Sequence, residues 1–469
     1  MPNFDITRGR LKRTMPLAGF TARAAGGRIV AGLREKAGDD GAVERFHERT
    51  AEHYAELLGH SKGVLMKLGQ AMSLIDTSSM GSGGFAPYQK AMTRLQADVP
   101  PMDPALVRQI LGAELGSAAE QFADFDDEAM AAASIGQVHR AALRDGRDVV
   151  VKIQYPGVAE AIRDDLANTE LAATFLRFAM ASSGMKVDVR TTAREWSERI
   201  SEELNYRQEA ANIATFSALY RSHPFIRIPQ VIPEMSTGRV LTMTYLDGMD
   251  WAAAQHAEQD LKNTWAEVIM RFSLGNHRHA NLIHADPHPG NYRFHPDGTV
   301  GFLDFGCITV IPEHTRWHFV AMSRAAIDDR IDEFRHHMVQ LGFLTEDSDI
   351  TAEELYEWFA PMLHEVLANK QPATYTPDTT ARTLSGLLDI RDSDHLLARM
   401  TVPKEQAFGS RVGLAIGHIC AGLNATVYAR ASADDMDGIA EPITELGKLH
   451  HAWVRQRGLP GALDHHDQL

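Results

Sequence analysis

Four polar residues of this chain have side chains of the kinds that handle phosphate and magnesium. Lys152 follows a run of three valines, and its ammonium group could neutralise phosphate oxygens. Asp286 and Asn291 share the loop 284–291, and Asp304 opens the sequence Asp-Phe-Gly. Carboxylate and amide oxygens are ligands that suit Mg²⁺. These residue types together predict a site for ATP or ADP with bound Mg²⁺.

The order of these residues matches that of protein kinases, in which a strand lysine precedes an H-x-D-x-x-x-x-N loop and a D-F-G sequence. Phosphoryl transfer depends on a neutralised triphosphate and an aligned acceptor more than on covalent chemistry by the protein. We therefore expect Lys152 to contact the α- and β-phosphates, and Asp304 and Asn291 to hold Mg²⁺. Asp286 would lie near the acceptor hydroxyl as its base or orienting group.

Each of these pieces also has an ordinary structural interpretation. A lysine after a valine run can be a strand-end charge, and Asp-Phe-Gly occurs in common turns. The loop is more specific, because loops rarely need His284, Asp286 and Asn291 at this spacing with two prolines stiffening the backbone. The histidines around it resemble no zinc pattern, and we expect His284 to brace the loop.

The segment from Ala131 to His139 takes the place of the Gly-rich phosphate loop of protein kinases. Alanine largely replaces glycine here, and because alanine restricts φ and adds a methyl group, this cover should be stiffer. The alternative interpretation is the start of an alanine-rich helix. We expect cofactor contacts from five residues of the segment: Ala131, Ala132, Ala133, Ser134 and Gln137.

Several of these motifs together resemble the UbiB/ADCK (AarF-like) family of atypical kinases. The similar segments are the alanine-rich one, the run from Lys152 to Val158, the loop 284–291, and Lys67-Leu-Gly-Gln70, which matches the K-x-G-Q signature of that family. The similarity runs from about residue 60 to about residue 310. It implies that the K-x-G-Q helices fold over the nucleotide cleft, so that Lys67 and Gln70 face the active site.

The same resemblance implies a glutamate partner for Lys152 in an E-x-D-Y-x-x-E-A sequence, which corresponds to residues 203–210. Glu203 is the first candidate for this ion pair and Glu209 is the second. Asn205 stands where the family usually has aspartate, which removes one carboxylate from the neighbourhood of Lys152.

A further segment, Met243 to Gly248, resembles the family's linker near the expected hinge between the lobes. Thr244 stands where an acidic residue is often found. Adenine recognition in this linker is mostly through the backbone, so the change is tolerable. We expect Met243 and Tyr245 at the cofactor.

Members of the family are linked to the biosynthesis of ubiquinone or other isoprenoid quinones and to lipid handling, generally at membranes. The resemblance implies an ATP-dependent phosphotransferase or ATPase whose partners include an isoprenoid lipid or a quinone precursor. One alternative is a small-molecule phosphotransferase of the aminoglycoside or choline kinase type, which shares the His-x-Asp loop but lacks the K-x-G-Q helices. The other is a nucleotide-switched pseudokinase that binds partners without useful phosphate transfer.

The elements that must position these residues follow an α+β pattern, which we interpret as a two-lobed, protein-kinase-like fold. Short β-branched segments flank a turn at 144–147, and helical periodicity dominates after Trp251. We divide the chain into a basic leader (1–42), a helical extension with the K-x-G-Q motif (43–125), an N-lobe with an inserted helix (126–248) and an enlarged helical C-lobe with the catalytic loop and D-F-G (249–469).

Composition is consistent with this division. The 469 residues, 44% of them apolar, can bury a large core. A net charge of −15 argues against nucleic-acid binding, although the basic leader could lie on an anionic membrane surface as a peripheral attachment. Two cysteines favour a reducing compartment, and we expect a cytoplasmic protein without a signal peptide. The apolar stretch 412–428 contains three glycines and is expected to be a buried helix.

Overall fold

The structure is a computed structural model that describes residues 101–133, 135–160, 204–380, 396–401 and 403–464, with residues 162 and 383 and parts of the stretch 27–52. Four predicted site residues lie outside the described residues: Lys67, Gln70, Ser134 and Glu203. The chain divides into two compact units. The first is Met1–Ala210 with Val231–Tyr245, and the second is Ala211–Gln230 with Leu246–Leu469.

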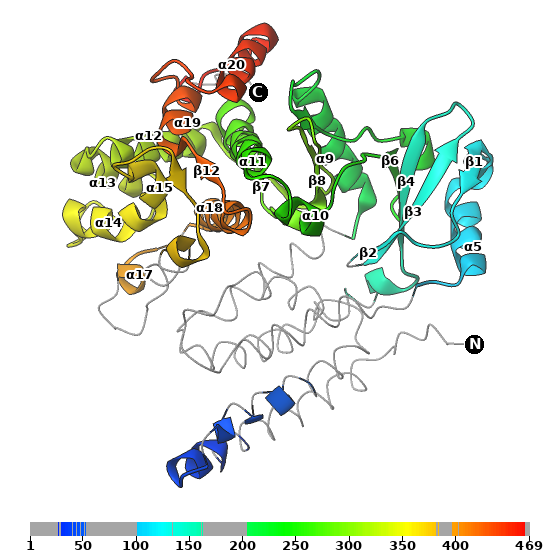
Figure 1. The fold of residues 1–469 in the computed structure, drawn as a ribbon, viewed down its shortest axis with the longest axis horizontal. Coiled ribbons are helices and arrows are strands. Elements are labelled where there is room, and N and C mark those ends of the chain that lie inside the picture. The colour runs from blue at the N-terminus through cyan, green and yellow to red at the C-terminus, as the bar shows by residue number, and fades with distance from the viewer. Residues whose placement is uncertain are drawn as a thin grey trace. The chain divides into compact units, whose positions relative to one another are not determined.

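The first unit contains an antiparallel sheet with the strand order β1-β3-β4-β6, in which β2 also pairs with β3 (Figure 1). The β4 strand is buried from Val149 to Gln154, which explains why its sequence is rich in β-branched residues. The predicted turn at 144–147 joins β3 to β4, with Gly146 at a φ of +88°. The strands are β1 (Phe122–Phe125), β2 (Ala131–Ala133), β3 (Gly136–Leu143), β4 (Asp148–Gln154) and β6 (Val240–Thr244).

The alanine-rich segment forms the first strand of a hairpin and not the start of a helix. Ala133 pairs with Gly136 where β2 turns into β3. A Cβ atom on Gly136 would lie 2.2 Å from the carbonyl oxygen of Ile153, so glycine is required for β3 to approach β4 here. The segment therefore belongs to the sheet that also carries Lys152.

Helix α5 (Pro104–Leu115) precedes this sheet. The Asp103 side chain accepts a hydrogen bond from the Ala105 N–H at 2.8 Å and caps the helix, whose buried residues recur at helical spacing. The described part of this unit also contains two 3₁₀ turns, η1 (Gly116–Gln121) and η2 (Pro233–Met235). Because β1 ends at Phe125, the sheet begins inside the range 43–125 that we had assigned to the helical extension.

Residues 211–230 belong to the second unit, although the predicted N-lobe range 126–248 includes them. The reason is local pairing, because β5 (Ile226–Arg227) runs parallel to β9 (Val300–Phe302) of the second unit. Helix α9 (Tyr206–Leu219) therefore begins in the first unit and continues in the second. The division after Tyr245 falls within the segment that we predicted to be the linker.

The second unit is mainly helical and is built around α11, which is buried along most of its 22 residues (Figure 1). Its helices and 3₁₀ turns are α10 (Trp251–Gln255), α11 (Gln259–Ala280), η3 (Pro289–Asn291), α12 (Glu313–Ile327), α13 (Ile331–Gln340), α14 (Ala352–Phe359), η4 (Ala360–Leu363), α15 (His364–Leu367), α17 (Leu396–Arg399), α18 (Lys404–Gly422), α19 (Ala429–Met436) and α20 (Glu445–Arg457). Its other strands are β7 (Leu282–His284), β8 (Tyr292–Phe294), β9 (Val300–Phe302), β10 (Ile308–Val310), β11 (Ala373–Thr374) and β12 (Thr426–Val427).

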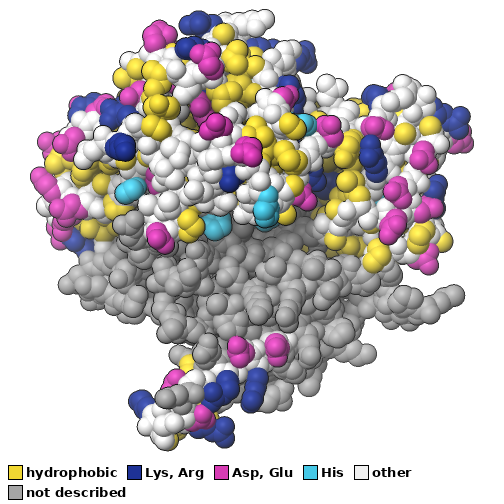
Figure 2. Space-filling model, in the orientation of Figure 1, with side chains coloured by type: hydrophobic (Ala, Val, Ile, Leu, Met, Phe, Trp, Pro, Cys, Tyr) yellow, Lys and Arg dark blue, Asp and Glu magenta, His cyan; other side chains and the backbone are white. Residues whose placement is uncertain are grey.

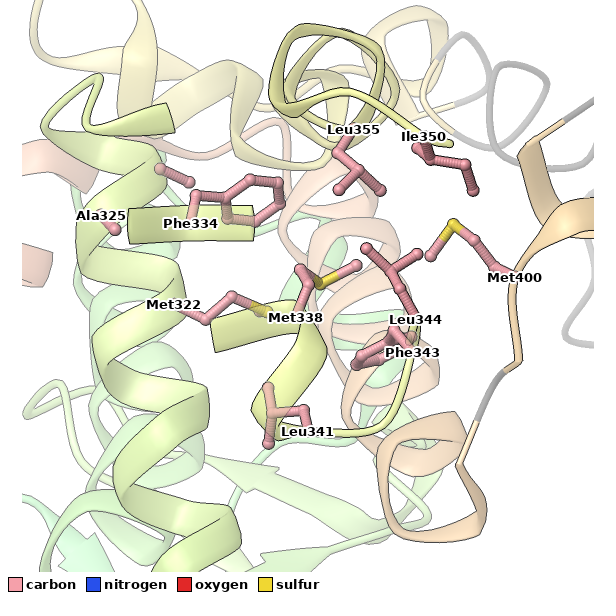
Figure 3. Close-up of a cluster of buried hydrophobic side chains, with 11 residues drawn as sticks. Met322, Ala325, Phe334, Met338, Leu341, Phe343, Leu344, Ile350, Leu355 and Met400 are labelled. Carbon is pink, nitrogen blue, oxygen red and sulfur yellow. The ribbon is translucent and has the colours of Figure 1, made fainter. Parts of the chain in front are cut away.

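A hydrophobic cluster fills the space between α12, α13 and α14. Figure 3 shows Met322, Phe334, Met338 and Leu355 pointing toward one another, and all four are at most 1% exposed. Such close packing is typical of protein interiors and fixes the mutual positions of these helices.

Buried ion pairs fasten α19 to the rest of the second unit. The Arg271 guanidinium on α11 donates two hydrogen bonds to Asp435, each 2.8 Å long, and Arg278 donates one to Asp437 at 2.6 Å. The Arg271 side chain is 0% exposed and that of Asp435 is 1% exposed, so neither charge has water as an alternative partner.

The predicted buried helix at 412–428 is divided between the end of α18 and the short strand β12. No helix in the described part of the chain is long and apolar enough to cross a membrane. On the face shown in Figure 2, acidic and basic side chains are interspersed over the described surface.

Candidate nucleotide site

The lysine of the first unit forms a buried ion pair. Lys152 lies in the middle of the sheet, opposite Val138 on β3 and Leu241 on β6. Its Nζ donates to Oε1 of Glu209 at 2.6 Å, and the two side chains are 10% and 6% exposed. A charge-assisted hydrogen bond of this length holds the lysine ammonium in a defined position.

Among the described residues the partner of Lys152 is Glu209, the second candidate, whereas the first candidate, Glu203, lies outside the described residues. Helix α9 begins only at Tyr206, and the Asn205 side chain accepts a hydrogen bond from the Arg207 N–H at 3.1 Å. Asparagine caps helices about as well as aspartate, so the replacement of the family's aspartate preserves this start. Glu209 then falls in the first helical turn, where the helix dipole favours a carboxylate.

Gln137, predicted to contact the cofactor, has a structural position instead. Its side chain is buried, its Oε1 accepts from the Met102 N–H at 2.8 Å, and its Nε2 lies 2.7 Å from Nε2 of His139. The His139 Nδ1 donates to the carbonyl oxygen of Asp126 at 2.8 Å, which leaves Nε2 to accept from Gln137. Burial also lowers the pKa of His139, so its ring is neutral near pH 7. Gln137 therefore binds the segment at Met102, which precedes helix α5, to strand β3.

The three alanines of β2 remain accessible. Ala131 and Ala132 are exposed and Ala133 is half-buried. Among the described residues of this hairpin, the backbone and methyl groups of these alanines are accessible to a ligand, whereas the Gln137 side chain is buried.

The two linker residues differ in exposure. Met243 is 4% exposed and pairs with Val150 inside the sheet. Tyr245 follows β6, donates its N–H to the carbonyl oxygen of Asp148 at 2.9 Å, and stacks against Arg140, whose guanidinium carbon lies 4.4 Å from the ring centroid. The sheet thus positions the backbone of this segment, while the side chains of Met243 and Tyr245 pack against other residues of the first unit.

Two short ladders in the second unit bring Asn291 and Asp304 together. Strand β8 begins directly after Asn291 and pairs with β9, which ends directly before Leu303. The Leu303 N–H donates to the carbonyl oxygen of Asn291 at 3.0 Å. Both predicted magnesium ligands therefore lie at the same end of one hairpin.

The second ladder, between β7 and β10, holds the beginning of the same loop. The Ala285 N–H donates to the carbonyl oxygen of Cys307 at 2.9 Å, and the Nε2 of His284 donates to the carbonyl oxygen of Asp304 at 2.7 Å. The expectation that His284 braces the loop is confirmed. This bond fixes the backbone of Asp304, whose Oδ1 in turn accepts from the Gly306 N–H at 2.9 Å.

Asp286, the predicted base, is half-buried in this loop near Tyr292. Burial, with the negative charge of Asp286 as the next cause, raises the pKa of Tyr292 far above its usual range. The loop histidines have separate environments, since His288 accepts from the Gly290 N–H at 3.1 Å while His284 binds Asp304. Within the described residues, no group of three His, Cys, Asp or Glu side chains could hold a metal ion.

Sequence reasoning missed Asn212. Its Nδ2 donates to the carbonyl oxygen of Phe305 at 2.8 Å, and Phe216, one turn further along α9, packs on the Phe305 ring with centroids 4.9 Å apart. The signal that could have revealed Asn212 is its position three residues after Glu209, because residues at this spacing share a helix face.

The residues present suit a magnesium nucleotide. Asp304 and Asn291 supply hard oxygen donors of the kind that Mg²⁺ binds, and Lys152 supplies a fixed cation for phosphate oxygens. The first unit thus carries the lysine and its glutamate, and the second carries the loop and the aspartate of D-F-G.

Comparison with known families gives one match over more than half of the chain. The family model described as "ABC1 atypical kinase-like domain" matches residues 94–337. The atypical kinase COQ8B of Rattus norvegicus is 28% identical over 424 residues, which are 90% of this chain and 76% of that protein.

Two further relatives match this chain over a smaller part of their own length. The atypical kinase COQ8 of Saccharomyces cerevisiae is 32% identical over 61% of this chain and 56% of its own length. ACTIVITY OF BC1 COMPLEX KINASE 1 of Arabidopsis thaliana is 33% identical over 56% of this chain and 39% of its own length. The chain therefore spans about half of the yeast protein and well under half of the plant protein.

Among solved structures, the chain is similar to Rv3197 of Mycobacterium tuberculosis, determined in complex with erythromycin. The TM-score is 0.59 and the identity is 29%, over 89% of this chain and 98% of that one.

Proposed function

Because the chain belongs to the ABC1 atypical kinase-like family and has a kinase-like fold, we propose that it binds Mg-ATP and hydrolyses it or transfers its γ-phosphate. The observation that carries the proposal is the buried Lys152–Glu209 ion pair at 2.6 Å. Kinases require a strand lysine paired with a helix glutamate before the lysine can serve the nucleotide phosphates.

Each residue of the set has one task in this proposal. Lys152 binds the α- and β-phosphates, and Asp304 and Asn291 hold the metal. Bound Mg²⁺ supplies charge neutralisation on the phosphate oxygens. Asp286 orients the acceptor hydroxyl or water and accepts its proton.

We further propose that this turnover supports the biosynthesis of an isoprenoid quinone or the handling of a lipid, with an isoprenoid lipid or quinone precursor as partner. The atypical kinases among the relatives support this assignment. The arginines and lysines of the basic leader would attach the protein peripherally to an anionic membrane.

Nucleotide binding can be tested through thermal stability. Mg-ATP should raise the melting temperature of the wild type, because a ligand that binds only the folded state stabilises it. Asp304→Asn should lose the magnesium-dependent part of this shift, whereas Asp349→Asn, at a residue with an 87% exposed side chain, should keep it. Equal shifts in all three proteins would remove Asp304 from the site.

Turnover can be tested through phosphate release. Lys152→Ala and Asp286→Asn should abolish release, while Lys448→Ala, which removes an exposed lysine, should not change it. A protein that binds Mg-ATP normally but releases no phosphate under any condition would be a pseudokinase.

A second candidate function is transfer to a small molecule. The observation that favours it is the similar structure determined with erythromycin, which is matched over 98% of its chain. A mass increase of one phosphoryl group on erythromycin, dependent on ATP and on Asp286, would support this function. Unmodified erythromycin together with rapid ATP hydrolysis would contradict it.

A further inference from the structure

A partly open cavity of about 300 Å³ is lined by residues of the second unit. It opens where three hydrophobic clusters meet, and each cluster contributes to its wall: Met338 from the cluster of Figure 3, Val366 from a second around α11 and α18, and Ile283 from a third beside β7. An apolar ligand that fills this space would give the lining side chains packing partners.

Two glycines on α18 help to form this space. Gly413 and Gly417 are four residues apart and line the cavity, so they share one face of the helix. A Cβ atom on either glycine would meet no described atom within 4 Å. Glycine lowers helix stability relative to leucine, and here it leaves room that a larger side chain would fill.

Tyr375 and Glu365 are two of the polar residues in the wall, and they are near enough for the charge of Glu365 to act on Tyr375. Burial raises the pKa of the Tyr375 hydroxyl well above its usual range, with further contributions from Cys420 and Glu365, so the hydroxyl stays protonated. The Glu365 side chain is 11% exposed. This pair offers one hydroxyl donor and one carboxylate acceptor.

Two other titratable groups of the wall, Arg278 and His277, add no free positive charge. Arg278 forms an ion pair with Asp437 at 2.6 Å. Burial lowers the pKa of His277 to about 3, so its ring is neutral. An anionic head group would therefore meet the Glu365 carboxylate without a compensating cation from these groups.

We propose that this cavity binds a single lipid alcohol, with its hydroxyl between Tyr375 and Glu365 and its hydrocarbon chain along the methionine and isoleucine side chains. The apolar residues of the wall select a hydrocarbon chain, the Tyr375–Glu365 pair selects a group that both donates and accepts, and the Glu365 charge excludes phosphate and carboxylate heads.

The cavity also contacts the loop that carries Asp286. Ile283 and His284 of β7 line it, and His284 donates to the carbonyl oxygen of Asp304. An occupied cavity stabilises β7 and should change the response to Mg-ATP. This consequence depends on the proposed function, whereas lipid binding itself does not.

The experiment uses the full chain, freed of bound lipid, and titrates it with farnesol below its aggregation limit. Calorimetry should show one saturable site, and Gly417→Leu should weaken binding by at least about tenfold because its side chain occupies the space. Leucine is a good helix former, so this variant should melt no lower than the wild type without ligand. Gly112→Leu, on α5 and also in open space, is the matched control and should bind farnesol like the wild type.

The head group is tested separately. Tyr375→Phe should weaken farnesol binding by about three- to tenfold, the effect of one hydrogen bond, without changing binding of the hydrocarbon farnesane. Farnesyl diphosphate should not bind at this site. Absence of farnesol binding to the wild type, or equal affinity in a folded Gly417→Leu, would overturn the proposal. Mg-ATP binding measured on the same samples separates either result from a failure of the nucleotide site.

Discussion

Asn212 binds the carbonyl oxygen of Phe305 through its Nδ2 at 2.8 Å, three residues after the glutamate that pairs with Lys152. One helix, α9, thus carries a partner of the strand lysine and a partner of the D-F-G backbone. Residues at this spacing lie on the same side of a helix, so the two contacts depend on the same helical rotation.

Replacing Asn212 should therefore reduce turnover. Asn212→Leu leaves the Phe305 carbonyl without this donor, and a lost hydrogen bond to a buried group costs about 1–3 kcal/mol. We expect phosphate release to fall about tenfold, with Lys152 and Glu209 unchanged. Thr215→Ala, on an exposed side of α9, is the control and should keep the wild-type rate. Wild-type turnover in Asn212→Leu would show that the contact has no positioning role.

Breaking the Lys152–Glu209 pair should destabilise the protein more than removing both charges. Glu209→Leu removes the carboxylate at 2.6 Å from a buried ammonium group, which costs up to about 3–5 kcal/mol, whereas the double variant Lys152→Met/Glu209→Leu should recover part of this loss. Urea denaturation measures the free energies of unfolding. Phosphate release should be absent from both variants. A double variant that is no more stable than the single one would contradict the assigned pairing.

Stability should fall in acid because of His277. Its pKa is lowered from 6.5 to about 3 by burial, so the unfolded chain binds a proton that the folded protein does not. The contribution is complete above pH 6.5 and is lost as the pH falls from 6.5 toward 3, by up to about 1.4 kcal/mol per pH unit. Melting temperatures between pH 7 and 4 should decline less steeply for His277→Leu than for the wild type. The exposed control His256→Leu should follow the wild-type slope; identical slopes in all three proteins would refute the prediction.

The Arg271–Asp435 pair should dominate the attachment of α19. Arg271→Leu leaves Asp435 buried without its bidentate partner, and we expect a loss of about 3–5 kcal/mol in the free energy of unfolding. The exposed pair Lys448–Glu445 is the control, and Lys448→Ala should change stability by less than about 1 kcal/mol. Equal effects of the two substitutions would show that burial of the pair is unimportant.

Deletion of residues 1–42 should weaken binding to anionic vesicles. The interaction is electrostatic and should also weaken at high salt, because ions screen charges separated by more than about 10 Å at 0.1 M. Vesicle co-sedimentation of the full chain and the deletion variant, at low and high salt, measures the effect. Binding that is independent of both the deletion and the salt would exclude this mode of attachment.

The local parts of the site could be predicted from the sequence because short-range rules determine them. A valine run makes a buried strand, so Lys152 was placed correctly on β4. The spacing of the loop and of D-F-G fixed the residues that the β8–β9 hairpin brings together, Asn291 and Asp304. These predictions needed no knowledge of distant contacts.

The pairing of Lys152 with Glu209 needed such knowledge. Glu209 falls in the first turn of α9, where its carboxylate reaches Lys152. That position depends on where α9 begins, and the Asn205 cap helps to set this start. The burial of Gln137 was missed for a similar reason, because its partner Met102 lies 35 residues earlier. The cavity beside α18 depends on three clusters from distant parts of the chain, which no local pattern encodes.

The continuity of α9 has a consequence for how this segment can change. Insertion of a single residue between Glu209 and Asn212 would rotate one relative to the other by about 100° and move them about 1.5 Å further apart along the axis. Either the lysine or the D-F-G backbone would then lose its partner, whatever residue was inserted. The first half of α9 should therefore tolerate substitutions on its exposed side but no insertion or deletion.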